Sequence, residues 1–158
     1  MSRYERPNIA QMQGYASGEQ PEDGSSIKLN TNENPYPPSP RVAAALASFA
    51  TEQLRIYPQP DARLLRQAIA KHHNVSVGNV VITHAGDEAL RLAITTFVPP
   101  DGTVASTEPT YSLYPVLAQI QGASMYTHAL SADWSLPSDF AAKVNAAGLV
   151  DHVKICLL

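Results

Sequence analysis

The fold is decided by residues 80–97, which read VVITHAGDEALRLAITTF. The stretch opens with four β-branched residues, Val80–Thr83, a composition that favours a strand. His84–Gly86 then leads into a helix expected over Asp87–Phe97, because apolar residues recur there at helical spacing. Strand, short turn and helix in this order form the repeating unit of α/β proteins.

The N-terminal end of this expected helix, its mouth, has the composition of an anion site. Gly86 lets a ligand approach the backbone closely, since glycine has no Cβ. The first N–H groups of a helix have no intrahelical acceptor and point toward such a ligand. However, Asp87 and Glu88 also complement the helix dipole without any ligand. Taken alone, the pattern favours the structural interpretation over the phosphate site.

The same alternation continues towards the C-terminus. Strands are expected at 103–106, 123–128 and 153–158, with helices over 111–121 and from Ser138 onward. The chain is therefore predicted to be an α/β protein with a mainly parallel sheet, Val80–Thr83 included, and helices on both faces. Because an apolar strand ends the sequence, the α/β domain is expected to be incomplete.

The first part of the chain differs in character. Residues 1–38 are rich in Pro, Gly, Asn and Ser and show no period, which indicates an extended arm. Ser39 and Pro40 suit the start of a helix of about four turns, with Val42, Leu46 and Phe49 on one face.

Composition excludes several classes of protein. The chain has 158 residues, 44% of them hydrophobic, a formal net charge of -3 and one cysteine. This balance indicates a globular, cytoplasmic protein and gives no reason to expect a nucleic-acid or membrane partner. One cysteine forms no disulfide framework, and the five histidines lack the spacing of metal ligands, so no metal site is predicted.

Four motifs carry a family resemblance. They are KLNTNENPYPPSP at 28–40, RIYPQPDARLLRQAIA at 55–70, GDEAL at 86–90 and PTYSLY at 109–114. In this order they resemble the N-terminal part of histidinol-phosphate aminotransferases, which are fold-type-I enzymes that use pyridoxal 5'-phosphate. The similarity runs from about Tyr15 to Leu158.

The resemblance implies a cofactor site at the mouth described above. Gly86 and Asp87 would bind the cofactor phosphate through their backbone N–H groups, with Ala85 in the preceding turn. Tyr111 would stack on the pyridine ring. Many relatives have serine or alanine at the position of Gly86, so a hydroxyl contact is absent here.

The resemblance also implies an assembly and a substrate. Tyr57 would reach the phosphate of the neighbouring subunit in a homodimer of the full-length protein, and Tyr15 and Asn34 would lie near the substrate. Residues 1–57 would form the arm and the first part of a small domain, and residues 58–158 the N-terminal part of the cofactor-binding large domain. The expected reaction converts histidinol phosphate and 2-oxoglutarate to imidazole acetol phosphate and glutamate in histidine biosynthesis.

The chain does not contain a lysine in the serine-flanked loop that the family uses. The reaction needs a lysine that forms a Schiff base with the cofactor, whereas the lysines here are Lys28, Lys71, Lys143 and Lys154. No catalytic residue is therefore predicted within these 158 residues, and the chain alone is expected to be inactive. The N-terminal motifs leave open an aromatic amino-acid aminotransferase, a threonine-phosphate decarboxylase and a non-catalytic module that binds a phosphorylated ligand.

Overall fold

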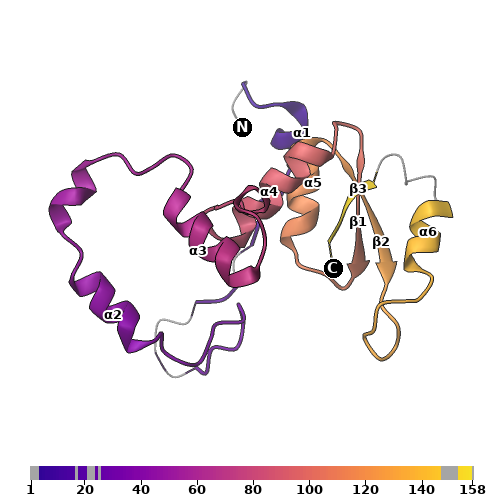
Figure 1. The fold of residues 1–158 in the computed structure, drawn as a ribbon. Helices are drawn as coiled ribbons and strands as arrows, with labels where there is room; N and C mark the ends of the chain where they lie inside the picture. The colour runs from indigo at the N-terminus through magenta and orange to yellow at the C-terminus, as the bar shows by residue number, and fades with distance from the viewer. Residues whose placement is uncertain (1–3, 17, 21–23, 25, 147–152, 158) are drawn as a thin grey trace. The chain divides into compact units, whose positions relative to one another are not determined.

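A computed structural model describes residues 4–16, 18–20, 24, 26–146 and 153–157 (Figure 1). The contacts between residues divide the chain into two compact units. Unit 1 comprises the described residues of Met1–Tyr15 and Thr83–Leu158, and unit 2 comprises those of Ala16–Ile82. Among the described residues, no helix has the length and apolar character needed to cross a membrane.

Unit 1 begins with a one-turn helix and continues as alternating helices and strands. Its elements are α1 (Pro7–Ala10), α4 (Ala85–Phe97), β1 (Thr103–Glu108), α5 (Leu113–Gln121), β2 (Ser124–Ala129), α6 (Phe140–Ala146) and β3 (Val153–Leu157). Unit 2 contains α2 (Pro40–Ala47), the 3-10 helix η1 (Thr51–Arg55), α3 (Arg63–His73) and the 3-10 helix η2 (Val77–Asn79).

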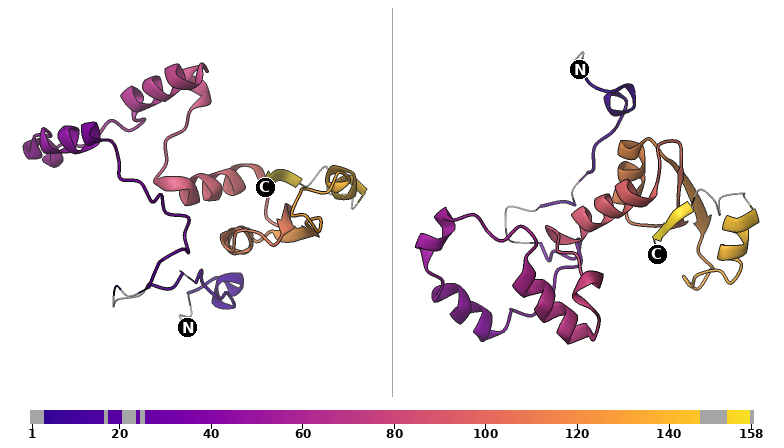
Figure 2. Two further views of the ribbon diagram at one scale, coloured as in Figure 1. Left: turned by 90° about the horizontal axis from the view of Figure 1, so that it is seen from below. Right: turned by 45° about the horizontal axis from the view of Figure 1, so that its top comes forward.

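The three strands of unit 1 form one parallel sheet in the order β2-β1-β3. The chain crosses from β1 to β2 through α5 and then returns past β1 to β3 through α6. Crossovers between parallel strands are right-handed, so two crossovers in opposite directions place their helices on opposite faces. Figures 1 and 2 show α5 and α6 on opposite sides of the sheet. The predicted parallel sheet with helices on both faces is confirmed.

The core of unit 1 lies between the sheet and helices α4 and α5. Its buried members are Ile94, Val98, Val104, Leu113, Leu117 and Ala118. Because side chains alternate along a strand, the side chain of Ser106 lies on the same face of β1 as that of Val104. Helix α5 ends at Gly122, whose φ of 80° is one that glycine adopts without strain, as predicted from its position.

The predicted strand at Val80–Thr83 is wrong. The segment does not join the sheet; Val80 has extended dihedral angles, and its carbonyl accepts a hydrogen bond from Arg66 Nε at 2.9 Å. Both edges of β1 are already paired with β2 and β3. Strand propensity alone makes no ladder, since a strand requires a neighbour with free backbone groups.

The helix predicted from Pro40 is shorter than expected. The Ser39 side chain accepts a hydrogen bond from Arg41 N at 3.3 Å, as an N-cap should, but α2 ends at Ala47 and the 3-10 helix η1 follows. The apolar residues Val42, Leu46 and Phe49 are exposed. The secondary structure of α2 therefore follows local capping, since none of its residues is buried.

Candidate functional site

The mouth of helix α4 is fixed by two hydrogen bonds among four residues. Ala85 has a φ of 62°, a left-handed conformation that is unusual for a residue with a Cβ. The Thr83 hydroxyl donates to the Ala85 carbonyl at 2.9 Å, and the Glu88 carboxylate accepts the His84 backbone N–H at 2.6 Å. This last bond lowers the pKa of Glu88 below its ordinary value. The turn is therefore held by hydrogen bonds at the place where the strained residue lies.

Gly86 and Asp87 follow this turn in the first turn of α4, and both are exposed. A Cβ placed on Gly86 would meet no other atom within 4 Å. The N–H groups of the first helical turn have no acceptor within the helix, and the helix dipole is positive at this end. The mouth thus offers open space, backbone donors and a favourable potential to an anion.

Tyr111 lies beside the same mouth, although it comes from another part of the sequence. Its hydroxyl donates to Asp87 Oδ1 at 3.2 Å. The ring of Tyr15 meets the Tyr111 ring at 6.2 Å with an interplanar angle of 69°, and Tyr114 meets it at 5.6 Å and 89°. Both neighbours are edge contacts, and Tyr111 remains 40% exposed. A planar group could therefore stack on this ring.

These contacts extend the pH range in which Tyr111 stays protonated. Hydrogen bonding with Tyr15, together with desolvation and the charge of Asp87, raises the pKa of Tyr111 to about 12. A phenol is already neutral at physiological pH with its ordinary pKa, and its proton is available to the Asp87 carboxylate.

The sheet places this group at its ligand-binding edge. Tyr111 follows the carboxyl end of β1, and open parallel sheets bind ligands beyond the carboxyl ends of their strands. A pocket of about 420 Å³ adjoins Tyr111 on this edge. It is lined by Thr107, Pro109, Thr110, Tyr111, Tyr114, Leu130, Trp134 and Leu136.

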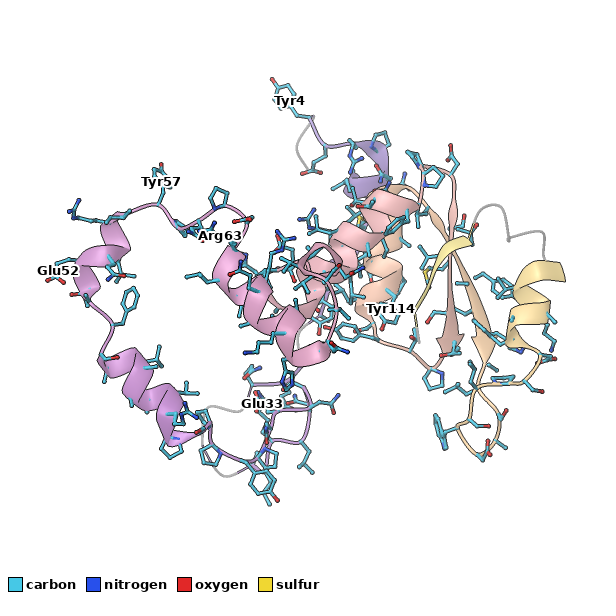
Figure 3. The ribbon with its side chains drawn as sticks, viewed as in Figure 1. Tyr4, Glu33, Glu52, Tyr57, Arg63 and Tyr114 are labelled. Atoms are coloured by element: carbon cyan, nitrogen blue, oxygen red, sulfur yellow. The ribbon has the colours of Figure 1, made fainter. Side chains whose placement is uncertain are left out.

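Five of the residues predicted for the site come together in unit 1. Asp87, Tyr111 and Tyr15 are joined by the contacts above, and Ala85 and Gly86 precede Asp87 directly. Asn34 and Tyr57 belong to unit 2. There, Asn34 Oδ1 accepts the Tyr36 N–H at 3.0 Å, and Tyr57 is 98% exposed and projects away from its neighbours (Figure 3). The binding roles of all seven residues stay predictions.

Two residues that shape the site were missed from the sequence. Glu88 was assigned only to the helix dipole, whereas its carboxylate also holds the backbone of His84. Glu88 lies four residues after the N-cap His84, one more than in a capping box, so the sequence carried no standard signal for this contact. Tyr114 was missed because its contact with Tyr111 depends on where α5 begins, two residues after Tyr111.

Comparison with known proteins defines the class. The sequence profile of the aminotransferase class I and II family matches residues 25–147. The chain belongs to this family. It is 40% identical over 148 residues to a histidinol-phosphate aminotransferase of Clostridium botulinum (strain Langeland) and 44% identical over 123 residues to one of Acinetobacter baumannii (strain AYE). The matches cover 94% and 76% of this chain but only 41% and 34% of those proteins.

Solved structures agree with this assignment. The histidinol-phosphate aminotransferase of Sinorhizobium meliloti, solved in complex with pyridoxal-5'-phosphate, superposes with a TM-score of 0.79 at 21% identity over 94% of this chain and 41% of that chain. A putative histidinol-phosphate aminotransferase of Erwinia carotovora atroseptica gives a TM-score of 0.68 at 25% identity over 78% of this chain and 35% of that chain. The predicted fold class, part of an aminotransferase of this fold type, is confirmed.

Proposed function

We propose that this chain supplies the phosphate anchor and the stacking ring of a pyridoxal-phosphate-dependent histidinol-phosphate aminotransferase. The observation that carries the proposal is the hydrogen bond from Tyr111 to Asp87, which joins the stacking ring to the anion-binding mouth of α4. The named relatives at 40% and 44% identity support this substrate over other amino donors. The chain spans 41% of the length of the Clostridium relative, so the activity of the whole protein is part of the proposal.

The residues present suit the cofactor. A phosphate requires donors and close approach, which the N–H groups of Gly86 and Asp87 and the open space at Gly86 provide. A pyridine ring requires a flat apolar surface, which Tyr111 provides. When bound, pyridoxal phosphate supplies an aldehyde that reacts with amines and a ring that withdraws electrons from the α-carbon.

The residues of this chain would bind and orient. Gly86 and Asp87 would hold the phosphate at one end of the cofactor, while Tyr111 would keep the ring parallel to its own. The Tyr111–Asp87 hydrogen bond couples these two functions, because it ties the hydroxyl end of the ring to the first turn of α4. Fixed orientation of this kind lowers a reaction barrier by several kcal/mol, on the order of the effects measured for intramolecular reactions.

We further propose that none of the four lysines is the one that bonds to the cofactor. Lys28 forms an ion pair with Glu33, and Lys143 forms one with Asp139 at 3.1 Å. Lys71 lies in the last turn of α3, within unit 2, and Lys154 lies in strand β3. The 158 residues alone would then bind cofactor and not transaminate.

The full-length protein is proposed to act in the cytoplasm as a homodimer on histidinol phosphate and 2-oxoglutarate. The 98% exposure of Tyr57 supports a role outside its own unit, at the phosphate of the partner subunit. Residues 1–57 would be the arm and first part of the small domain, and residues 58–158 part of the large domain. In the full-length protein, Tyr57→Phe should weaken cofactor binding by about tenfold, the effect of one lost hydrogen bond to a charged group.

The test uses the purified 158-residue chain and pyridoxal phosphate. Absorbance titration should show saturable binding that inorganic phosphate competes away and that Tyr111→Ala weakens. Borohydride reduction followed by peptide mapping should find no stoichiometric lysine adduct, and histidinol phosphate with 2-oxoglutarate should give no turnover. Absence of saturable binding would contradict the anchor, and turnover with one modified lysine would contradict the assignment of the lysines.

A further inference from the structure

The C-terminal end of α5 is covered by the N-terminal arm. Arg6 Nη2 donates to the Ile120 carbonyl at 3.1 Å, and Asn8 Nδ2 donates to the Gln119 carbonyl at 3.0 Å. Ile120 O has lost its helical donor, because the backbone N–H of Ser124 instead donates to Gly102 O at 2.8 Å. Arg6 therefore satisfies a carbonyl that the helix itself leaves open, and Asn8 adds a second donor to the Gln119 carbonyl, which already accepts the Gly122 N–H at 3.1 Å.

Charge and local structure both favour this contact. The last turn of a helix carries the negative end of its dipole, which attracts the Arg6 guanidinium. Arg6 is the N-cap of α1, and Asn8 lies within that single turn, which closes with the Ala10 N–H on the Arg6 carbonyl at 3.0 Å. The two donors are thus presented together by one folded turn.

The other end of the arm lies at the other end of α5. Tyr15 contacts Tyr111, just ahead of the first turn of the helix. Residues Ala10 to Tyr15 span up to about 17 Å when extended, and α5 is about 14 Å long. The arm is therefore long enough to run the length of α5 between these two contacts.

We infer that residues 6–15 form a strap along α5, in which Arg6 and Asn8 are positioning residues that hold Tyr15 against the cofactor-stacking Tyr111. The inference rests on the proposed function for its effect on the cofactor, but the strap itself does not need the cofactor. The raised pKa of Tyr111 agrees with it, since hydrogen bonding with Tyr15 is the largest cause. Arg6 and Asn8 would then influence the site from the far end of a helix.

The experiment compares the full 158-residue chain with Arg6→Ala, the double variant Arg6→Ala/Asn8→Ala, and Arg6→Lys. Arg41→Ala is the charge-matched control, an exposed arginine in α2 of unit 2. Two quantities are measured: the nuclear Overhauser effect between the Tyr15 and Tyr111 rings without ligand, and the dissociation constant of pyridoxal phosphate. The double variant should lose the Overhauser effect and bind the cofactor about fivefold to tenfold more weakly, the effect of the lost hydrogen bonds.

Arg6→Lys should restore both quantities in large part, because an ammonium group also donates to the Ile120 carbonyl, and Arg41→Ala should change neither. If Arg6 and Asn8 only stabilise α5, the double variant unfolds more easily but keeps the Overhauser effect, and the strap is refuted. Loss of the Overhauser effect with unchanged cofactor affinity would refute the positioning role. If the unmodified chain does not bind pyridoxal phosphate, the proposed function fails, while the Overhauser comparison still decides the strap.

Discussion

The hydroxyl of Tyr111 and the carboxylate of Asp87 lie 3.2 Å apart, although 24 positions separate them in the sequence. The bond joins the start of α4 to the loop that follows the carboxyl end of β1. Because Tyr111 is the donor, the bond leaves the backbone N–H groups of the α4 mouth available to a ligand.

The first prediction concerns the separate contributions of the Tyr111 ring and the Tyr111 hydroxyl to cofactor binding. Tyr111→Ala should weaken pyridoxal phosphate binding by about tenfold, because a stacking surface is lost. Tyr111→Phe keeps the ring and loses only the contact with Asp87, so its dissociation constant should stay within about threefold of the unmodified chain. Absorbance titration measures both. Equal effects of the two substitutions would contradict stacking as the role of the ring.

A second prediction concerns the open space at Gly86. The Gly86→Ser side chain should fit without displacing any atom, since a Cβ there meets nothing within 4 Å. Its hydroxyl would add a donor at an anion site and should tighten pyridoxal phosphate binding by about tenfold. Gly86→Ala is the matched control, which adds the Cβ without the donor and should leave the affinity nearly unchanged. Tightening by alanine as well would point to a backbone effect instead.

A third prediction follows from the titration of Tyr111. Its pKa rises from the model-compound value of 10.0 to about 12 in the folded chain. A raised pKa stabilises the folded state fully below pH 10 and loses this contribution as the pH rises to about 12. Tyr15→Phe removes the largest cause. The difference in unfolding free energy between the two chains should therefore be constant below pH 10 and shrink between pH 10 and 12, as measured by denaturant titration. A difference that grows with pH would have the wrong sign.

A fourth prediction concerns the internal stability of unit 2. Arg66 Nε donates to Val80 O and Nη2 to Val77 O, both at 2.9 Å, so one guanidinium ties the segment after η2 to helix α3. Arg66→Ala should lower the free energy of unfolding by about 2 kcal/mol, and Arg66→Lys should recover little, because an ammonium group cannot address both carbonyls at once. Arg63→Ala, an exposed site on the same helix, serves as the control and should have little effect. Denaturant unfolding measures all three.

Local signals in the sequence predicted much of unit 1. The helix at 87–97, the strand at 103–106 and the stop at Gly122 were all recovered, because each depends on residues that are neighbours in the chain. The strand predicted at Val80–Thr83 is wrong for the opposite reason, since a strand needs a partner strand and local propensity does not supply one. Helical spacing also did not decide burial, since Phe97 is 57% exposed at the end of the same helix in which Ile94 is buried.

The candidate site likewise combines local features that the sequence indicated with long-range contacts that it did not. The local pattern at residues 80–97 drew attention to Gly86 and Asp87, and the family resemblance implied their phosphate role, whereas the link of Asp87 to Tyr111 is visible only in the folded structure. The contacts of Arg6 and Asn8 with α5 join residues that are 114 and 111 positions apart in the sequence. No sequence pattern predicted these contacts. The composition of residues 1–38 predicted an extended arm, but it did not predict which helix the arm contacts.

The left-handed backbone of Ala85 has a consequence for the evolution of this mouth. Replacing the methyl group with hydrogen would relieve about 1 kcal/mol of strain, so a selection for thermal stability alone would favour glycine at this position. Because alanine itself disfavours this conformation, the turn depends on the hydrogen bonds of Thr83 and Glu88 to keep it. A substitution that removes either bond should therefore destabilise the turn more with alanine at position 85 than with glycine there.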